Sequence, residues 1–435
     1  MDFDVADPFW TAPTRSGPRG EVDAFAVCER KGAQCIAGTR NRTGAPAMIF
    51  SANSHFVEPA HVFEGRMPRH LTDRAPRVID FGETGQAWTF AGQVRPLIQC
   101  TAVAGIPQDR WSGKEVVRYE NIRKGCFDPH ARLADMDLDG VDVAVCYSAY
   151  SGMGFGGDLF YYSEDLELAH AAIRAFNDWT HEEWIAADPA RFVAIGAISY
   201  RDPEEAAREV RRNAVRGFKG VLFRNPVDLG LPWVGDSVWH PFFRACEETE
   251  TVVVHHTSAL DAWPARSPTT DTPVPYGSVT VLFQSSAMDT LNSFLWAGVG
   301  NRFPRIKVLI SESGGSWLPH LIRRIEWALG WAPMFSEGWP DRNIGPAEAI
   351  ARNFAFSTLE PDQALALERD HGIAGWMLED DYPHMESVWP NTASHFREQL
   401  QHEPSEFAER FLWRNGAALF RHDMPVRSAS SAQPA

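Results

Sequence analysis

Histidine, amide and carboxylate side chains gather at the ends of short apolar runs in four parts of the sequence. These residues are Asn53, His55, His255, His256, Glu312, Asp381 and His384. Imidazole nitrogens and carboxylate oxygens are the donors that divalent metal ions take in proteins. The set therefore indicates a metal centre, provided that the fold brings the four parts of the chain together.

Strand geometry limits which of these side chains can point in the same direction. Asn53 and His55 are two positions apart, so in an extended backbone both project to one side. His255 and His256 are neighbours, so a regular strand directs at most one of them into a shared site. Glu312 has a second interpretation, because an acidic residue before a Gly-Gly pair can cap the helix that follows.

Eight apolar runs rich in β-branched residues could carry these side chains. They span residues 47–53, 141–147, 192–198, 217–223, 251–257, 306–312, 353–358 and 375–380. Most are continuously apolar, as expected for strands covered on both faces. Helical periodicity is clearest between them at 166–187, 203–215, 318–330 and 361–372. The pattern predicts an α/β fold, a (β/α)8 TIM barrel, whose functional residues lie at the carboxyl ends of its strands.

The barrel is expected to be a single domain over residues 48–425. Residues 1–47 read as an irregular extension, and residues 426–435 read as a disordered tail because they are small and polar. The long segments 56–140 and 258–300 are expected to form loops over the mouth of the barrel.

Composition narrows the class of protein. The 435 residues are 44% hydrophobic and 23% charged, which suits a globular chain with a large core. The formal net charge of −16 disfavours nucleic acid as a partner. There is no apolar run long enough to span a membrane, and the acidic start is unlike a secretory signal, so we expect a cytoplasmic protein. Six scattered cysteines without a CxxC pair argue against a cysteine zinc site.

From about Met48 to Arg421 the sequence resembles the amidohydrolase-related family typified by aminocarboxymuconate semialdehyde decarboxylase. The motifs that carry the resemblance are SANSHFVEP, FDPHARLADMDLDGVDVAVCY, RNAVRGFKGVLFRNP, VVVHH, SESGGSWLP and EDDYPHMESVWP. RLADMDLDGVD and DYPH are the more specific of these. The resemblance implies a metal-dependent barrel enzyme of the amidohydrolase superfamily, commonly a homodimer.

The resemblance also assigns residues. It implies that the first strand supplies ligands at Asn53 and His55, the fifth supplies His255, and the eighth supplies Asp381 as ligand and proton-handling carboxylate. Members with a histidine before the Gly-Gly turn use it near substrate or metal, whereas this chain has Glu312 there.

Asn53 departs from the family pattern, which has an acid or a histidine at that position. An amide oxygen is a poorer donor than a carboxylate and removes one negative charge from the site. We favour three explanations in this order: Glu312 compensates for the charge, the metal binds weakly, or metal chemistry has been abandoned.

These observations favour a metal-dependent decarboxylase, a carbon–carbon lyase that acts on a small carboxylated aromatic or unsaturated acid. Asp381, His255 and Glu312 are the expected catalytic residues, and zinc is favoured over manganese as the divalent metal. Arg224, His256 and His384 are expected to bind the substrate, although Arg224 suits a structural ion pair equally well. Two alternatives remain open: a metal-dependent hydrolase or hydratase, and a metal-free barrel with a binding or biosynthetic role.

Overall fold

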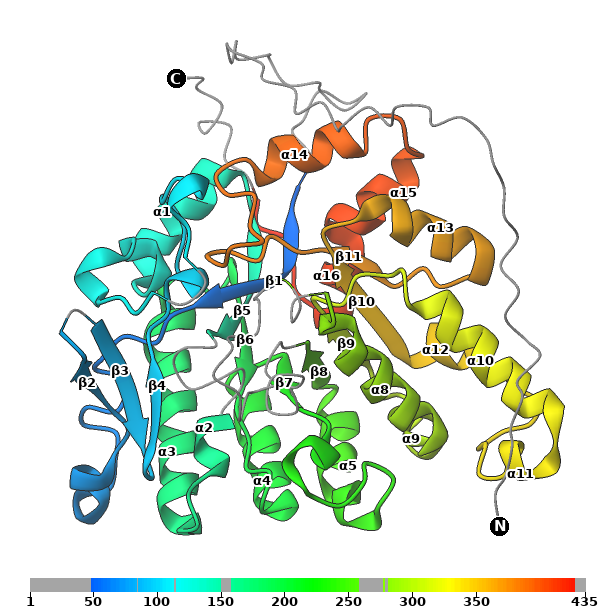
Figure 1. Ribbon diagram of the computed structural model, residues 1–435, viewed down its shortest axis with the longest axis horizontal. Coiled ribbons are helices and arrows are strands. Elements are labelled where there is room, and N and C mark those ends of the chain that lie inside the picture. Colours follow the sequence, from blue (N-terminus) through cyan, green and yellow to red (C-terminus); the bar gives the residue numbers. More distant parts are fainter. Residues whose placement is uncertain are drawn as a thin grey trace, which may run out of the picture.

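A parallel eight-stranded sheet forms the centre of the chain in the computed structural model (Figure 1). The structure describes residues 48–83, 85–112, 115–149, 158–257, 277 and 281–426. In sheet order the strands are β1 (Phe50–Phe56), β5 (Val143–Ser148), β6 (Phe192–Gly196), β7 (Gly220–Leu222), β8 (Val252–His256), β9 (Val308–Ser311), β10 (Phe354–Thr358) and β11 (Trp376–Leu378). All eight predicted strands are confirmed.

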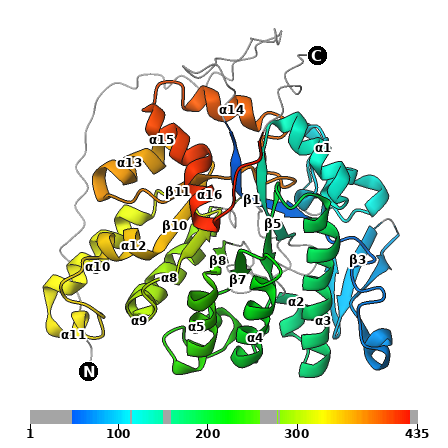
Figure 2. The same ribbon diagram turned by 180° about the vertical axis from the view of Figure 1, so that it is seen from behind.

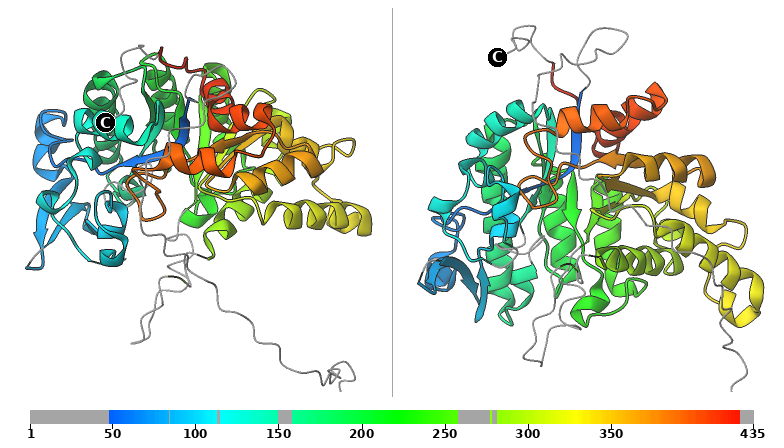
Figure 3. Two further views of the ribbon diagram at one scale, coloured as in Figure 1. Left: turned by 90° about the horizontal axis from the view of Figure 1, so that it is seen from above. Right: turned by 45° about the horizontal axis from the view of Figure 1, so that its top comes forward.

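The sheet curls into a nearly closed barrel. The backbone N–H groups of Asp380 and Asp381, just after β11, donate to the carbonyl of Asn53 in β1 at 3.3 and 3.1 Å. This contact brings the two ends of the sheet together (Figure 3). The predicted (β/α)8 architecture is therefore confirmed.

Helices surround the strands. They are α1 (Pro129–Asp139), α2 (Asp158–Tyr161), α3 (Leu166–Trp179), α4 (Pro203–Ala214), α5 (His240–Thr249), α8 (Phe283–Trp296), α9 (Val299–Arg302), α10 (Leu318–Trp331), α11 (Pro333–Ser336), α12 (Pro346–Asn353), α13 (Pro361–His371), α14 (Thr392–Gln399), α15 (Ser405–Glu409) and α16 (Asn415–Phe420). Two π-helical turns, Thr180–Ile185 and Arg410–Arg414, continue α3 and α15. The last helices run beside β1 and β11 at the back of the molecule (Figure 2). In the described part of the chain no helix has the length and apolar character needed to cross a membrane.

The segment between β1 and α1 is more ordered than the sequence indicates. It holds a three-stranded antiparallel sheet of β2 (Arg77–Phe81), β3 (Gly85–Phe90) and β4 (Gln93–Pro96), together with short 3-10 helices. This sheet lies at one side of the barrel (Figure 1). In the second expected loop, residues 283–296 form α8. Residues 258–276 lie outside the described part, as do 1–47 and 427–435.

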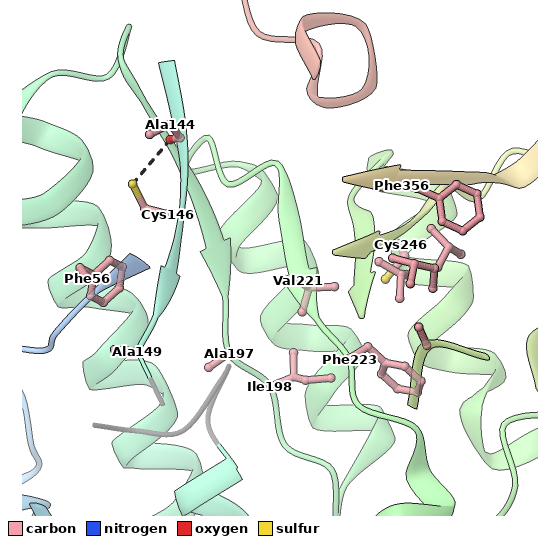
Figure 4. Packing of buried hydrophobic residues seen from close by; sticks show 14 of the residues in the cluster. Phe56, Ala144, Cys146, Ala149, Ala197, Ile198, Val221, Phe223, Cys246 and Phe356 are labelled. Carbon is pink, nitrogen blue, oxygen red and sulfur yellow. Dashed lines mark hydrogen bonds between the residues drawn. The ribbon is translucent and has the colours of Figure 1, made fainter. Parts of the chain in front are cut away.

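Two buried clusters separate the inside of the barrel from its outside. Val252, Val254 and Leu309 belong to an inner cluster, whereas Val253 packs outward with residues of the helices. Figure 4 shows part of the outer cluster, including Phe56, Phe223 and Phe356. The alternation along β8 places even-numbered residues inside the barrel.

β1 breaks this alternation. Phe50 and Ala52 belong to the inner cluster, so regular pairing would also turn Ser54 inward. The register with β5 shifts between Ser51 and Ser54. A β-bulge of this kind reverses which residues face the core. The shift therefore turns Asn53 and His55 toward the barrel interior.

Candidate metal centre

Four donor side chains converge at the carboxyl ends of the strands. They are His55 from β1, Glu312 from the residue after β9, and Asp381 and His384 from the loop after β11. One ligand atom from each lies within 4.8 Å of every other. Residues up to 329 positions apart therefore meet in a group small enough to hold a single ion.

His256 also enters this group. Its Nε2 lies 2.9 Å from Glu312 Oε2 and 3.2 Å from His55 Nε2. Its Nδ1 lies 2.7 Å from the carbonyl oxygen of Thr257, which fixes the orientation of the ring. A histidine whose second nitrogen donates to a carbonyl is the arrangement typical of a metal ligand.

The structure does not bring His255, which the sequence suggests as a ligand, into this group. The ring of His255 lies next to Thr290 on α8, with 3.3 Å between Nε2 and the threonine Oγ1. Val252 and Val254 face the barrel interior, so the next inward residue on β8 is His256. The structure thus brings His256, and not His255, next to His55 and Glu312.

His255 has the properties of a structural histidine. It is buried, and this burial together with the nearby His256 lowers its pKa to about 3. A neutral imidazole beside a hydroxyl group is satisfied by a hydrogen bond and needs no counter-charge.

Glu312 occupies the place that the sequence predicts and has an unusual backbone. Its φ of 56° lies in the left-handed region, which is uncommon for a residue other than glycine. Its backbone N–H lies 3.1 Å from Glu379 Oε2 and 3.2 Å from Ser357 Oγ, and its carbonyl accepts from Thr257 Oγ1 at 2.6 Å. These contacts hold the carboxylate of Glu312 beside His256.

Asp381 lies at the meeting point of two histidines. Its Oδ1 is 3.2 Å from His55 Nε2 and 3.2 Å from His384 Nδ1. The rings of His55 and His384 stack with centroids 3.8 Å apart. His384 therefore packs against the donor group, as a residue that orients a ligand would.

Asn53 points toward the same place but makes a weak contact. Its Nδ2 lies 3.4 Å from Glu312 Oε2. Its Oδ1 is buried and has no hydrogen-bond partner. A buried amide oxygen without a partner is costly in a protein interior.

The buried charges act on one another. Burial lowers the pKa of His55 well below its usual value, and His384 and His256 lower it further. Burial also lowers the pKa of His256, but Glu312, together with the carbonyl of Thr257 and Asp381, more than offsets this effect, so that the pKa of His256 is raised. The arrangement thus keeps His55 neutral, which is the form that binds a metal.

The donor set fits a divalent metal. Asp381 Oδ2 and the amide oxygen of Asn53 are buried without hydrogen-bond partners. The Nε2 atoms of His55 and His256 approach each other, and each also approaches a carboxylate. The two imidazoles would repel each other if both were protonated. A bound cation would satisfy all of these groups together.

Arg224, which the sequence suggests as a partner of the substrate, is the first residue but one after β7. Its backbone N–H donates to the hydroxyl of Tyr200 at 3.0 Å. Its charge opposes the rise that burial causes in the pKa of Asp228, and it contributes to the lowered pKa of His255. These electrostatic effects place the charge of Arg224 near Asp228 and His255.

Two residues of this region are not singled out by the sequence. Tyr147 of β5 belongs to the inner cluster, and its ring lies 5.7 Å from that of His55 and 5.4 Å from that of His256. Arg132 of α1 is 1% exposed and contacts the loop that carries Asp381. The alternation of Val143, Val145 and Tyr147 could have indicated that the tyrosine faces the barrel interior. For Arg132 the only signal was its position in the motif RLADMDLDGVD.

The chain is similar to known proteins in sequence and in fold. The amidohydrolase family model matches residues 121–422. The 2-amino-3-carboxymuconate-6-semialdehyde decarboxylase of Dictyostelium discoideum is 25% identical over 267 residues, which are 61% of this chain and 69% of the relative.

Two solved structures share the fold. An amidohydrolase from Mycobacterium avium subsp. paratuberculosis has a TM-score of 0.68 at 22% identity, covering 86% of this chain and 100% of that one. The 5-carboxyvanillate decarboxylase of Novosphingobium aromaticivorans, in complex with manganese and a nitrobenzoic acid, has a TM-score of 0.59 at 16% identity, covering 86% and 96%. With the family model covering more than half of its residues, the chain belongs to the amidohydrolase family.

Proposed function

We propose that this protein is a metal-dependent decarboxylase that acts on small carboxylated aromatic or unsaturated acids. The observation that carries the proposal is the convergence of His55, Glu312, Asp381 and His384 within 4.8 Å of one another, with His256 Nε2 beside His55 and Glu312. The curated relative from Dictyostelium discoideum is a decarboxylase of such an acid, and the manganese-bound structural neighbour is another decarboxylase.

The proposed ligands are His55, His256 and Asp381, with Glu312 and Asn53 completing the set. When bound, the metal supplies a Lewis acid that polarises an oxygen of the substrate. The role that the sequence suggests for His255 passes to His256, because the latter faces the donors. Glu312 supplies the negative charge that Asn53 lacks, which is the first of the explanations for the departure at position 53.

Asp381 is the proposed proton-handling residue. Its Oδ1 lies 3.2 Å from His55 Nε2 and 3.2 Å from His384 Nδ1, so a proton on this carboxylate would be within reach of a neighbouring imidazole. The adjacent His384 can relay that proton, since its Nδ1 lies 3.2 Å from Asp381 Oδ1. Arg224 is the proposed partner of a substrate carboxylate, through the paired donors of its guanidinium.

Zinc is the favoured metal and manganese the alternative, which the manganese bound in the structural neighbour supports. We further propose a homodimer, a cytoplasmic location and a small-molecule substrate. Light scattering tests the homodimer, cell fractionation tests the location, and metal analysis identifies the ion.

The reaction can be tested with purified protein reconstituted with zinc or manganese. Carboxylated phenols and unsaturated carboxylic acids would be supplied in water enriched in oxygen-18, and carbon dioxide and the organic product would be measured. Release of carbon dioxide without oxygen-18 in the organic product is expected. Incorporation of oxygen-18 into that product would instead identify a hydrolase or hydratase, and turnover without metal would support the metal-free alternative.

A further inference from the structure

Arg132 contacts two segments that carry proposed ligands of the metal, β1 and the loop after β11. Its side chain is 1% exposed, although a buried arginine is rare unless it is paired. It comes from α1, 77 positions from His55 and 249 from Asp381 in the sequence. Burying a cation costs free energy unless it is paired, so we expect this arginine to do more than pack.

The first contact is with β1. Arg132 Nη2 donates to the hydroxyl of Ser54, which lies between Asn53 and His55. Neighbouring residues of a strand point to opposite sides. The side chain of Ser54 therefore reaches the arginine while the flanking Asn53 and His55 face the donors.

The second set of contacts is with the loop after β11. The guanidinium carbon of Arg132 lies 3.5 Å from the centroid of the Tyr382 ring. Arg132 Nη2 lies 3.8 Å from Asp380 Oδ2. Asp380 and Tyr382 are the residues on either side of Asp381, so the arginine contacts both neighbours of that ligand.

The backbone between these segments is also joined. The N–H of His55 donates to the carbonyl of Tyr382 at 2.5 Å, and the N–H of Asp381 donates to the carbonyl of Asn53. Asp381 has a φ of 47°, a conformation that its surroundings must impose. The side-chain contacts of Arg132 add a further link between β1 and the loop after β11.

We propose that Arg132 is a positioning residue that sets the distance between His55 and Asp381, and thereby the affinity of the centre for its metal. This inference rests on the proposed function, because it assumes that these two residues are ligands. Residues behind the ligands commonly change metal affinity 10- to 100-fold when they are replaced. Arg132 would do so without touching the ion.

The test is the affinity of metal-free protein for Mn²⁺, measured by the electron paramagnetic resonance signal of the free ion. Arg132→Lys keeps the positive charge opposite Asp380 but loses the planar group that stacks on Tyr382 and reaches Ser54. We expect it to bind Mn²⁺ about tenfold more weakly than the wild type. Ser54→Ala removes a single hydroxyl group and is expected to weaken binding in the same direction.

Arg212→Lys is the matched control. Arg212 makes ion pairs with Asp178 and Glu209 on the outer helices, so its replacement also disturbs an arginine network. The affinity of the Arg212→Lys protein for Mn²⁺ should stay within about twofold of that of the wild type. Thermal unfolding of each metal-free variant establishes that an altered affinity belongs to a folded protein, and Ser54→Ala decides the question if Arg132→Lys does not fold.

The outcomes separate the two claims. A wild-type protein that binds no Mn²⁺ or Zn²⁺ would overturn the proposed function and this inference with it. A wild type that binds metal, together with folded Arg132→Lys or Ser54→Ala that binds equally tightly, would overturn the role of Arg132 alone. Weakened binding in these variants and unchanged binding in Arg212→Lys would support it.

Discussion

The Nε2 atoms of His55 and His256 face each other inside the barrel at a distance of 3.2 Å. Two imidazoles can share one hydrogen bond at this distance, but Asp381 and Glu312 also approach the same nitrogens. Four donors directed at one point are better satisfied by a divalent cation than by one another. The relationship between these two histidines is therefore the basis of the proposed metal centre.

Metal removal should destabilise the folded protein. A ligand that binds only the folded state adds about 2.7 kcal/mol when its free concentration is 100 times its dissociation constant. We expect a chelator to lower the thermal midpoint, and added Zn²⁺ or Mn²⁺ to restore it. Differential scanning calorimetry checks this, and His55→Asn, which cannot place a nitrogen at the Nε2 position, should show no shift with metal. An equal shift in that variant would place the metal elsewhere.

The negative charge that Glu312 supplies can be moved to position 53 by substitution. Asn53→Asp adds a carboxylate near Glu312 Oε2, which Asn53 Nδ2 approaches at 3.4 Å. We expect it to tighten metal binding roughly tenfold and to lower the stability of the metal-free protein, since the two anions repel. Competition with a chromophoric chelator measures the affinity.

The double variant Asn53→Asp with Glu312→Gln restores the original number of charges. Its affinity should return toward that of the wild type, whereas Glu312→Gln alone should bind metal more weakly. If Glu312→Gln binds as tightly as the wild type, Glu312 does not compensate for the amide at position 53.

Asp139 should give the stability a pH dependence. Burial, with a contribution from Asp380, raises its pKa to about 7, although its Oδ1 accepts from the N–H of Thr392 at 2.7 Å. Between the unfolded value near 4 and pH 7 the folded state binds the extra proton, so this residue's contribution to stability falls as the pH rises.

Asp139→Asn keeps the acceptor oxygen and does not titrate in this range. Its thermal midpoint relative to the wild type should therefore increase between pH 5 and pH 8, by the equivalent of up to a few kcal/mol. A difference between the two midpoints that is constant with pH would show that Asp139 is ionised throughout.

Replacement of Arg224 should affect substrate binding more than the chemical step. A hydrogen bond to a charged group contributes about 1.5–3 kcal/mol, so Arg224→Gln should raise KM about tenfold or more and leave kcat nearly unchanged. Steady-state kinetics on the substrate identified by carbon dioxide release provide the measurement. A lowered thermal midpoint with an unchanged KM would assign Arg224 to a structural ion pair.

The strands and main helices could be predicted because their signals are local. Continuously apolar runs indicated strands covered on both faces, and residues 166–187 showed helical periodicity that α3 and its π-helical extension confirm. The sheet β2 to β4 was missed, since β2 and β4 are short and only partly buried and lack a strong pattern.

The direction of side chains was harder to predict than the elements. β8 begins with three valines, which fit either face, so nothing local distinguishes His255 from His256. The inward direction of Asn53 and His55 depends on a register shift in β1, which arises from its pairing with β5. The contacts of Arg132 join segments that only the closed barrel brings together, so they too lie beyond local sequence signals.

The two neighbouring histidines of β8 provide the most direct test of the proposed centre. His255→Asn and His256→Asn introduce the same change one residue apart, and asparagine can replace the Nδ1 hydrogen bond of His256 to Thr257 but not its Nε2. Metal per chain would be measured by mass spectrometry after reconstitution with Zn²⁺. We predict that His255→Asn retains near-stoichiometric zinc and that His256→Asn loses it. Zinc retained by His256→Asn and lost from His255→Asn would contradict the proposed centre.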